Sequence, residues 1–312
     1  MFVESDLRDW RRRLHSAANH PAHGDPKSAS SRPRCANPSC RRGWLDLFKD
    51  RERPMFEDRW ACSTRCLRTL VDAAIRRESP VSSVAANPGR THRVPLGLIL
   101  LSRGWITQPQ LQHALTMQRS AGAGLIGRWL TEECGVAEEH VLNGLAVQWR
   151  CAVLSLHDFK PQEMALAVPR EIVERTDLVP LRISRRGTLR LAFSNNPNPA
   201  AALAVERMAG LSVESGLLPH ADWKSARGAI LHSESVRCSL EDLPDCESLS
   251  RRIASDLAGM QPRASRLVCI HSFFWLRMWL EDASLQGPFG TIPPAREDML
   301  DRIYTVDDRR AA

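Results

Sequence analysis

The sequence of 312 residues has no apolar run long enough to cross a membrane. A transmembrane helix needs about 20 predominantly apolar residues in a row. The amino terminus carries Asp6, Asp9 and three consecutive arginines at 11–13, where a secretory signal would have an apolar stretch. We therefore expect a cytoplasmic protein that does not insert into a membrane.

The common catalytic motifs are also missing. There is no Gly-x4-Gly-Lys-[Ser/Thr] phosphate loop, no Gly-x-Ser-x-Gly elbow and no His-Glu-x2-His. Adjacent acids such as Glu132 with Glu133, or Glu138 with Glu139, fall on expected helical turns, where solvated charges are usual. The sequence predicts a protein without enzymatic activity.

What is present is the composition of a globular protein, with 43% hydrophobic and 25% charged residues. The net charge of +7 is uneven, since residues 1–80 hold 17 Lys and Arg against 11 Asp and Glu, and the remainder 26 against 25. Nine cysteines without an export signal indicate metal ligands and buried thiols rather than disulfides. Cys238 and Cys246 are expected in a polar loop.

The pattern along the chain predicts an α+β protein with six segments. They are a basic helix and flexible linker (1–33), a four-cysteine module (34–78), a second linker (79–92), a helical double repeat (93–150), an α/β unit packed with it (151–235), and a small carboxy-terminal unit (236–312). In the last unit, residues 266–280 are dense in Val, Ile, Phe and Trp. Periodicity does not decide there between a strand, a hairpin and a buried helix.

Four cysteines carry the strongest chemical signal. Cys35-x4-Cys40 and Cys62-x3-Cys66 form two pairs separated by 21 residues, a spacing that can bring four thiolates into the tetrahedral site of structural Zn²⁺. The pattern is similar to a treble-clef-like zinc finger, with the second pair at the start of a helix. Such a site is closed and would stabilise the fold without catalysing a reaction. The alternative is four unrelated reduced cysteines, because these spacings are looser than the common x2 knuckle.

The basic residues around these cysteines suggest a second function. They are Arg41, Arg42, Arg51, Arg53, Arg59, Arg65 and Arg68. A cationic face could bind nucleic acid, which makes a zinc-dependent nucleic-acid-binding protein the alternative function. Acidic residues are interleaved with the arginines, so a mixed solvated surface is the competing interpretation.

An internal repeat occupies the middle of the chain. Residues 95–118 align with 125–148 without gaps, at an offset of 30. Apolar, glycine and glutamine residues recur in register: Gly97 with Gly127, Leu100 with Leu130, Leu115 with Leu145 and Gln118 with Gln148. This predicts two helix-turn-helix units packed as a pseudo-symmetric pair.

These residues, with the following segments 152–156 and 192–197, resemble the amino-terminal domain of type II secretion and type IV pilus ATPases, the GspE N-terminal or MshEN family. The resemblance covers about residues 93–232. It implies a regulatory or adaptor protein that binds a protein partner of secretion, pilus or signalling machinery. The phosphate loop of the ATPase module is absent.

The resemblance also implies cyclic di-GMP as a ligand, because some family members bind it through this repeat. The matching positions are Leu96, Gly97, Leu100, Leu111, Leu115 and Gln118 in the first motif and Ile126, Gly127, Leu130, Val141, Leu145 and Gln148 in the second. The leading arginines are replaced by Pro95 and Leu125, and Cys134 stands where the first motif has Gly104. Arg93 and Arg128 are out of register. A helical repeat that has lost its ligand, or that docks a partner, is the alternative.

Overall fold

The computed structural model describes residues 35–40, 55–79, 93–281, 292 and 296–306. The expected basic helix and linker at 1–33, and residues 80–92 of the second linker, lie outside these residues. The α+β class predicted from the sequence is confirmed. Among the described residues, no helix combines the length and apolar character that a bilayer crossing requires.

The double repeat consists of two helix-turn-helix units. Its helices are α4 (Leu96–Ser102), α5 (Gln108–Ala121), α6 (Ile126–Cys134) and α7 (Glu138–Trp149). Helix α5 begins with a capping box, in which the Thr107 and Gln110 side chains each bind the other residue's backbone N–H. Its end is set by Gly122, which adopts the left-handed conformation that favours glycine.

The α/β unit contains a four-stranded sheet with the order β3-β6-β5-β4. Its strands are β3 (Ala152–Val153), β4 (Val179–Ile183), β5 (Thr188–Phe193) and β6 (Ser212–Leu217). The β4–β5 pair is antiparallel, whereas β6 runs parallel to β5 and to β3. The helices of the unit are α8 (Pro161–Met164), α9 (Arg170–Arg175), α10 (Pro199–Ala209) and α11 (His220–His232).

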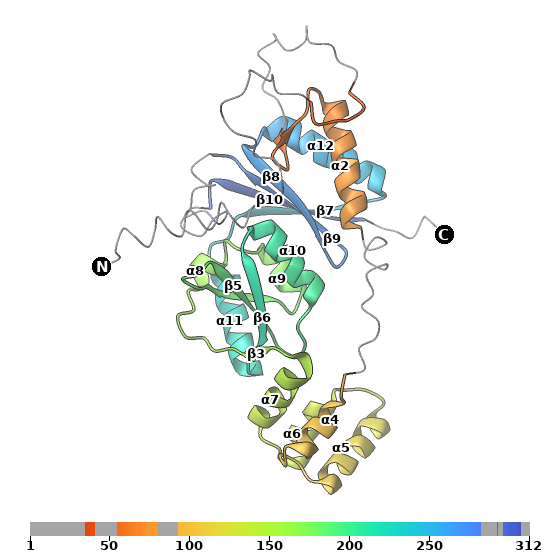
Figure 1. The fold of residues 1–312 in the computed structure, drawn as a ribbon, viewed down its shortest axis with the longest axis vertical. Helices are drawn as coiled ribbons and strands as arrows, with labels where there is room; N and C mark the ends of the chain where they lie inside the picture. The colour runs from red at the N-terminus through yellow and green to blue at the C-terminus, as the bar shows by residue number, and fades with distance from the viewer. Residues whose placement is uncertain (1–34, 41–54, 80–92, 282–291, 293–295, 307–312) are drawn as a thin grey trace, which may run out of the picture. The chain divides into compact units, whose positions relative to one another are not determined.

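A second four-stranded sheet, called here the C-terminal sheet, has the order β7-β10-β9-β8 (Figure 1). Its elements are β7 (Arg237–Leu243), α12 (Cys246–Met260), β8 (Ala264–Ile270), β9 (Phe273–Trp279) and β10 (Met299–Val306). The undecided stretch 266–280 is therefore a hairpin of β8 and β9. The predicted polar loop around Cys238 and Cys246 is wrong, because Cys238 lies in β7 and Cys246 is the first residue of α12.

Strands β8, β9 and β10 of the C-terminal sheet are buried on both faces, whereas the edge strand β7 is partly exposed. Alternate residues of β9 point to opposite sides, so that Trp275 and Trp279 join the core of the α/β unit. Phe274, Leu276 and Met278 join a separate core with helix α12. Because both faces are apolar, β9 shows no polar alternation, which explains why its sequence did not reveal a strand.

The four-cysteine segment supplies the other half of that separate core. It contains the hairpin β1 (Met55–Phe56) and β2 (Arg59–Trp60) and the helix α2 (Thr64–Glu78). Leu67, Leu70 and Val71 of α2 are buried with α12 against the C-terminal sheet. Figure 1 shows α2 and α12 beside this sheet. Residues almost 200 positions apart thus share one core.

A buried ion pair links the C-terminal sheet to the α/β unit. The guanidinium of Arg277 binds both carboxylate oxygens of Asp301, at 2.8 and 2.7 Å, and both side chains are almost wholly buried. The indole N–H of Trp275 donates to the same carboxylate, at 2.8 Å. Arg277 also donates to the Ala167 carbonyl, at 3.1 Å. These bonds satisfy two charges that would otherwise be costly to bury.

Candidate metal centre and helical double repeat

The four predicted metal ligands lie together. The sulfur atoms of Cys35, Cys40, Cys62 and Cys66 are all within 4.8 Å of one another. The Cys62 sulfur is 3.5 Å from that of Cys40 and 3.6 Å from that of Cys66. A tetrahedral Zn²⁺ with Zn–S bonds of about 2.3 Å needs sulfur separations of about 3.8 Å. The donor set and its spacing therefore fit a four-thiolate zinc site, with no coordination position left for water.

Local structure explains how these cysteines converge. Ser63 is the N-cap of α2, and its hydroxyl accepts the backbone N–H of Cys66, at 3.3 Å. This places Cys66 in the first helical turn, where the helix dipole favours a thiolate. The first knuckle is attached to the hairpin through a hydrogen bond from the Ala36 N–H to the Trp60 carbonyl, at 3.0 Å.

Asn37 supports the site without being a ligand. Its side-chain oxygen accepts the N–H of Ser39, and its amide N–H2 donates to the sulfur of Cys66, at 3.3 Å. The backbone N–H of Cys62 points at the sulfur of Cys35 in the same way, at 3.4 Å. Donors directed at sulfur stabilise thiolates and orient metal ligands. Sequence reasoning missed Asn37, although the Asn-Pro pair inside the first knuckle is a turn signal.

The surroundings shift the pKa values of Cys66 and Cys62 in opposite directions. Burial raises the pKa of Cys66, but hydrogen bonds from Asn37, Ser63 and neighbouring thiols outweigh it, and the pKa falls to about 7. Burial, followed by hydrogen bonds to Cys40, Cys66 and Cys35, raises the pKa of Cys62 to about 12. Adjacent thiols cannot all ionise without a compensating cation. A divalent metal would supply that positive charge.

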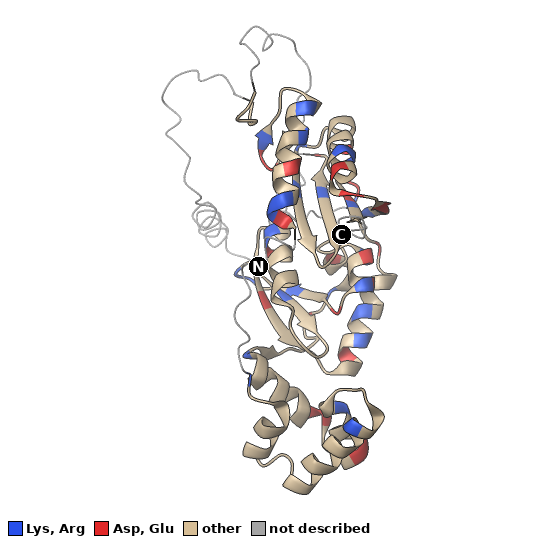
Figure 2. Ribbon diagram, turned by 90° about the vertical axis from the view of Figure 1, so that its right-hand side faces the viewer, with Lys and Arg blue, Asp and Glu red and all other residues tan. Residues whose placement is uncertain are grey.

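The described basic residues of this segment are largely engaged with acids. Arg68 binds Glu247 of α12 at 3.0 Å, and Arg59 lies 3.7 Å from Glu57. The ribbon of α2 in Figure 2 carries both basic and acidic positions, which agrees with a mixed surface. Arg41, Arg42, Arg51 and Arg53 lie outside the described residues, so binding of nucleic acid stays a prediction.

In the double repeat, equivalent residues of the two motifs make equivalent contacts. A Cβ on Gly97 would lie 2.5 Å from the Leu111 side chain, and one on Gly127 would lie 2.7 Å from Val141. Both pairs are related by the offset of 30. Each glycine thus permits close packing between the two helices of its own unit. Gly144 does the same between α7 and α4, where Leu96 and Leu100 lie 2.8 and 2.7 Å from its added Cβ.

The two glutamines join the units to each other. The Gln118 side chain, at the end of the first motif, donates to the Gly124 carbonyl before the second, at 2.7 Å. Gln148, at the end of the second motif, donates to the Val94 carbonyl before the first, at 2.8 Å. The acceptors are again 30 residues apart. These reciprocal bonds close the repeat into a pseudo-symmetric pair.

The remaining motif residues form the core of the repeat. Leu96, Leu100, Leu130 and Val141 are buried there, and half-buried Leu111, Ile126 and Leu145 pack against them; Leu115 is half-buried. The replacement of glycine by Cys134 is compensated, because Gly135 adopts the left-handed conformation that Gly104 provides in the first unit. The motif residues therefore have structural roles in this chain.

Neither out-of-register arginine is positioned as a simple replacement for the missing motif arginines. The guanidinium of Arg93 lies over the ring of Trp149, 3.6 Å from its centroid. Arg128 forms an ion pair with Glu132, one turn further along α6, at 2.9 Å. Both cations would have to leave these partners to contact a phosphate or a guanine.

No protein-family model matches the chain, and no curated protein is similar to it. Among solved structures, the chain is similar to the structure of MshE with cdg (cyclic di-GMP), at 25% identity and a TM-score of 0.35, over 44% of this chain and 98% of that one. It is also similar to the N-terminal domain of XpsE, at 18% identity and a TM-score of 0.25, over 47% of this chain and 99% of that one. These similarities bear out the resemblance found in the sequence. With TM-scores below 0.5, they identify neither a ligand nor a partner for this chain.

Proposed function

We propose that the protein is a non-catalytic adaptor whose double repeat docks a protein partner of secretion, pilus or signalling machinery. The observation that carries the proposal is the exposure of apolar side chains. Among the described residues, the large apolar side chains with the greatest exposure include Val94, Leu98, Leu125 and Val147, at 45–61%. All four belong to the double repeat, where such exposure favours a binding surface.

Charge adds a chemical preference for the partner. Residues 93–121, which include the first helix pair, contain three arginines, Arg93, Arg103 and Arg119, and no acidic residue. The acids of the repeat are all at 132–139. A partner that contacts the first helix pair should therefore offer apolar side chains together with acidic ones.

Paired substitutions test the docking. The full chain would be immobilised and presented with purified secretion, pilus and signalling components, as wild type and as a Leu98→Ser, Leu125→Ser variant. We expect at least one component to bind the wild type, and its affinity for the double variant to be at least tenfold lower. Leu203→Ser is the matched control, because Leu203 is 55% exposed on α10, outside the repeat. The proposal would be contradicted if a component bound the Leu98→Ser, Leu125→Ser variant as tightly as the control, or if no component bound the wild type.

Cyclic di-GMP binding is the second candidate function. It is supported by the two motifs, whose glycines and glutamines keep equivalent contacts. The missing arginines and the engaged Arg93 and Arg128 count against it. Calorimetric titration with cyclic di-GMP, and with GTP and ATP as controls, decides between the two. Selective binding that Gly127→Leu abolishes would favour the nucleotide, and no binding to a folded sample would leave the docking function.

The four cysteines are proposed to hold a structural Zn²⁺ in this adaptor. Their closed arrangement of four sulfur donors supports a role in folding rather than in catalysis. Metal analysis should give one zinc per chain, and the Cys62→Ser, Cys66→Ser variant should contain none. A folded chain without metal would refute the assignment.

A further inference from the structure

The turn between β1 and β2 sits at the junction of three parts of the fold. The N–H of Glu57 donates to the Ser265 carbonyl of β8, at 3.1 Å, and the Ser265 hydroxyl donates to the Met55 carbonyl, at 3.3 Å. Phe56, next to this turn, is completely buried in the core shared with α12. The hairpin that precedes Cys62 is thus attached to the edge of the C-terminal sheet.

This turn is conformationally strained. Glu57 and Asp58 both have positive φ, 49° and 58°, in the left-handed region where non-glycine residues are rarely found. Two-residue hairpin turns of this kind normally carry Asn-Gly or a similar pair. The sequence of this turn therefore does not favour its conformation, and surrounding contacts must maintain it.

An ion-pair network supplies those contacts. Glu57 forms a two-point bond with Arg77 of α2, at 2.5 and 3.0 Å. Arg77 also binds Glu78, at 2.8 Å, and Glu78 binds Arg207 of α10, at 2.9 Å. Only 5% of the Glu78 side chain is exposed, whereas its partners Arg77 and Arg207 are 40% and 43% exposed. We call the connected set Glu57, Arg77, Glu78 and Arg207 the latch.

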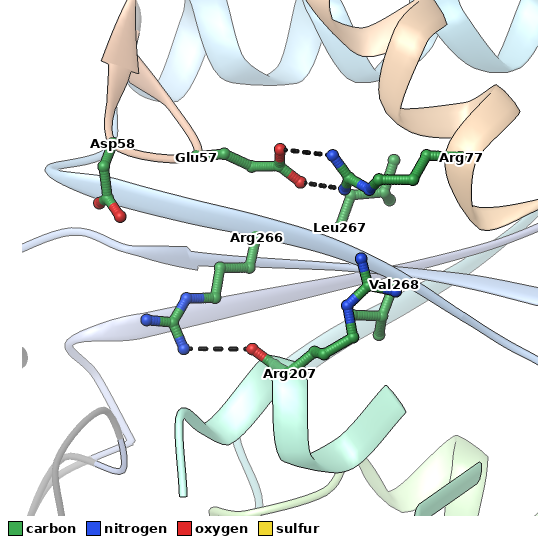
Figure 3. Close-up of a pocket in the computed structure, with 7 residues that line it drawn as sticks. All are labelled: Glu57, Asp58, Arg77, Arg207, Arg266, Leu267 and Val268. Atoms are coloured by element: carbon green, nitrogen blue, oxygen red, sulfur yellow. Dashed lines mark hydrogen bonds and ion pairs between the residues drawn. The ribbon is translucent and has the colours of Figure 1, made fainter. Parts of the chain in front are cut away.

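A cavity of about 260 Å³ lies beside the latch, lined by Glu57, Asp58, Arg77, Arg207, Arg266, Leu267 and Val268 (Figure 3). In this view Arg266 points from β8 toward the end of α10. Its guanidinium donates to the carbonyls of Arg207 and Met208, at 3.2 and 2.9 Å. These bonds satisfy carbonyls at the carboxyl end of α10. The metal segment, the C-terminal sheet and the α/β unit therefore meet at this point.

The metal ligands are connected to the latch through a short stretch of chain. Only Ala61 separates the end of β2 from Cys62, and the Ala36 N–H binds the Trp60 carbonyl. Cys66, on the other side, lies in the first turn of the helix that carries Arg77. A metal that joins both cysteine pairs fixes the hairpin and the start of α2 in one arrangement, and this arrangement presents Glu57 to Arg77.

We propose that the four-cysteine site is a metal-controlled clamp: metal binding holds the strained turn in the latch and α2 on the C-terminal sheet, and metal loss releases both. This inference rests on the proposed zinc site and adds a regulatory role to it. Release would expose apolar residues of this shared core, such as Leu267 of β8, the strand that α2 contacts. The chain would then differ in its available surface between metal-loaded and metal-free states.

Hydrogen–deuterium exchange of the full chain, zinc-loaded and after chelation, tests the clamp. Chelation should accelerate exchange at least tenfold in 55–78, and also in α12 and β8, which contain no metal ligand. Exchange in 96–149 should not change. Acceleration confined to the cysteines and their immediate neighbours, with α12 and β8 unchanged, would overturn the clamp.

Two arginine variants separate the latch from the metal site. Zinc-loaded Arg77→Met should retain one zinc per chain and still exchange faster around 55–60 and at the end of α10. Arg128→Met, which breaks the exposed ion pair with Glu132 in the repeat, is the control and should leave these segments unchanged. If these segments exchange in Arg77→Met as slowly as in the wild type, the latch does not hold the turn. A chain that binds no zinc in metal analysis would refute the zinc assignment itself, and the clamp with it.

Discussion

The double repeat and the C-terminal unit are stabilised in opposite ways. In the repeat, packing partners such as Gly97 and Leu111 are close in sequence, and the second unit repeats the contacts of the first. The C-terminal sheet instead packs against α2, which lies almost 200 residues earlier, and its buried charges are paired across strands. Most core contacts of the repeat are made within it, although Leu142 and Ala146 of α7 also join the core of the α/β unit. The C-terminal unit depends on a distant segment and, in our proposal, on a metal. The two regions should therefore respond independently to substitution.

The largest expected effect is the loss of the metal site. In Cys62→Ser, Cys66→Ser, the segment 55–78 should lose its fixed structure, because structural zinc contributes on the order of 10 kcal/mol to folding small modules. The C-terminal unit should then unfold at lower urea concentration, while the transition of the repeat is unchanged. Tryptophan fluorescence and helical circular dichroism, followed together during urea unfolding, would resolve the two transitions. If the variant unfolded in one transition at the same urea concentration as the wild type, the two regions would not be independent in this way.

Breaking the buried ion pair should be the next largest effect. Asp301→Ala leaves Arg277 charged and buried, which should lower the free energy of unfolding of the C-terminal unit by about 3–5 kcal/mol. The double variant Arg277→Met, Asp301→Leu should be much less destabilised, since neither charge then remains. Urea denaturation of the three proteins measures the difference. If the double variant is as unstable as Asp301→Ala, the unpaired charge is not the cause.

Asn37 provides a smaller test at the metal site itself. Asn37→Ala removes the amide that donates to the Cys66 sulfur, so the pKa of Cys66 should rise from about 7. Zinc affinity should fall by about 10–100-fold, the usual cost of losing such a supporting bond. Competition with a chromophoric chelator would measure it. Ser39→Ala is the control, because Ser39 contributes its backbone N–H to this turn and not its side chain.

The effect of substituting a helical glycine should depend on its neighbours. Gly144→Leu would force a side chain against Leu96 and Leu100 and should cost about 1–3 kcal/mol. Gly228→Ala, in the interior of α11, has no heavy atom within 4 Å of its added Cβ and should stabilise the chain by about 0.4–1 kcal/mol. Thermal unfolding of both variants tests the pair. A stabilising Gly144→Leu would mean that the helices of the repeat are not closely packed.

The sequence predicted the repeat well because its information is local. An ungapped offset of 30 placed the glycines, the leucines and both glutamines in register, and the structure shows equivalent contacts at those positions. The four cysteines were found from their spacing alone, and they do converge.

The C-terminal unit escaped prediction for physical reasons. Strand β9 is apolar on both faces, so the alternation that identifies a strand is missing. The pairing of Arg277 with Asp301, and that of Glu57 with Arg77, depend on the tertiary fold and leave no pattern in the chain. The boundaries predicted for 34–78 and 236–312 stay predictions, but the structure shows that these segments share one hydrophobic core.

Zinc K-edge X-ray absorption on the purified full chain tests the central claim most directly. We predict one zinc per chain, surrounded by four sulfur atoms at about 2.3 Å and no oxygen or nitrogen ligand. A metal-free folded chain, or a zinc bound by fewer than four sulfurs, would contradict the closed four-thiolate site on which this account of the C-terminal unit depends.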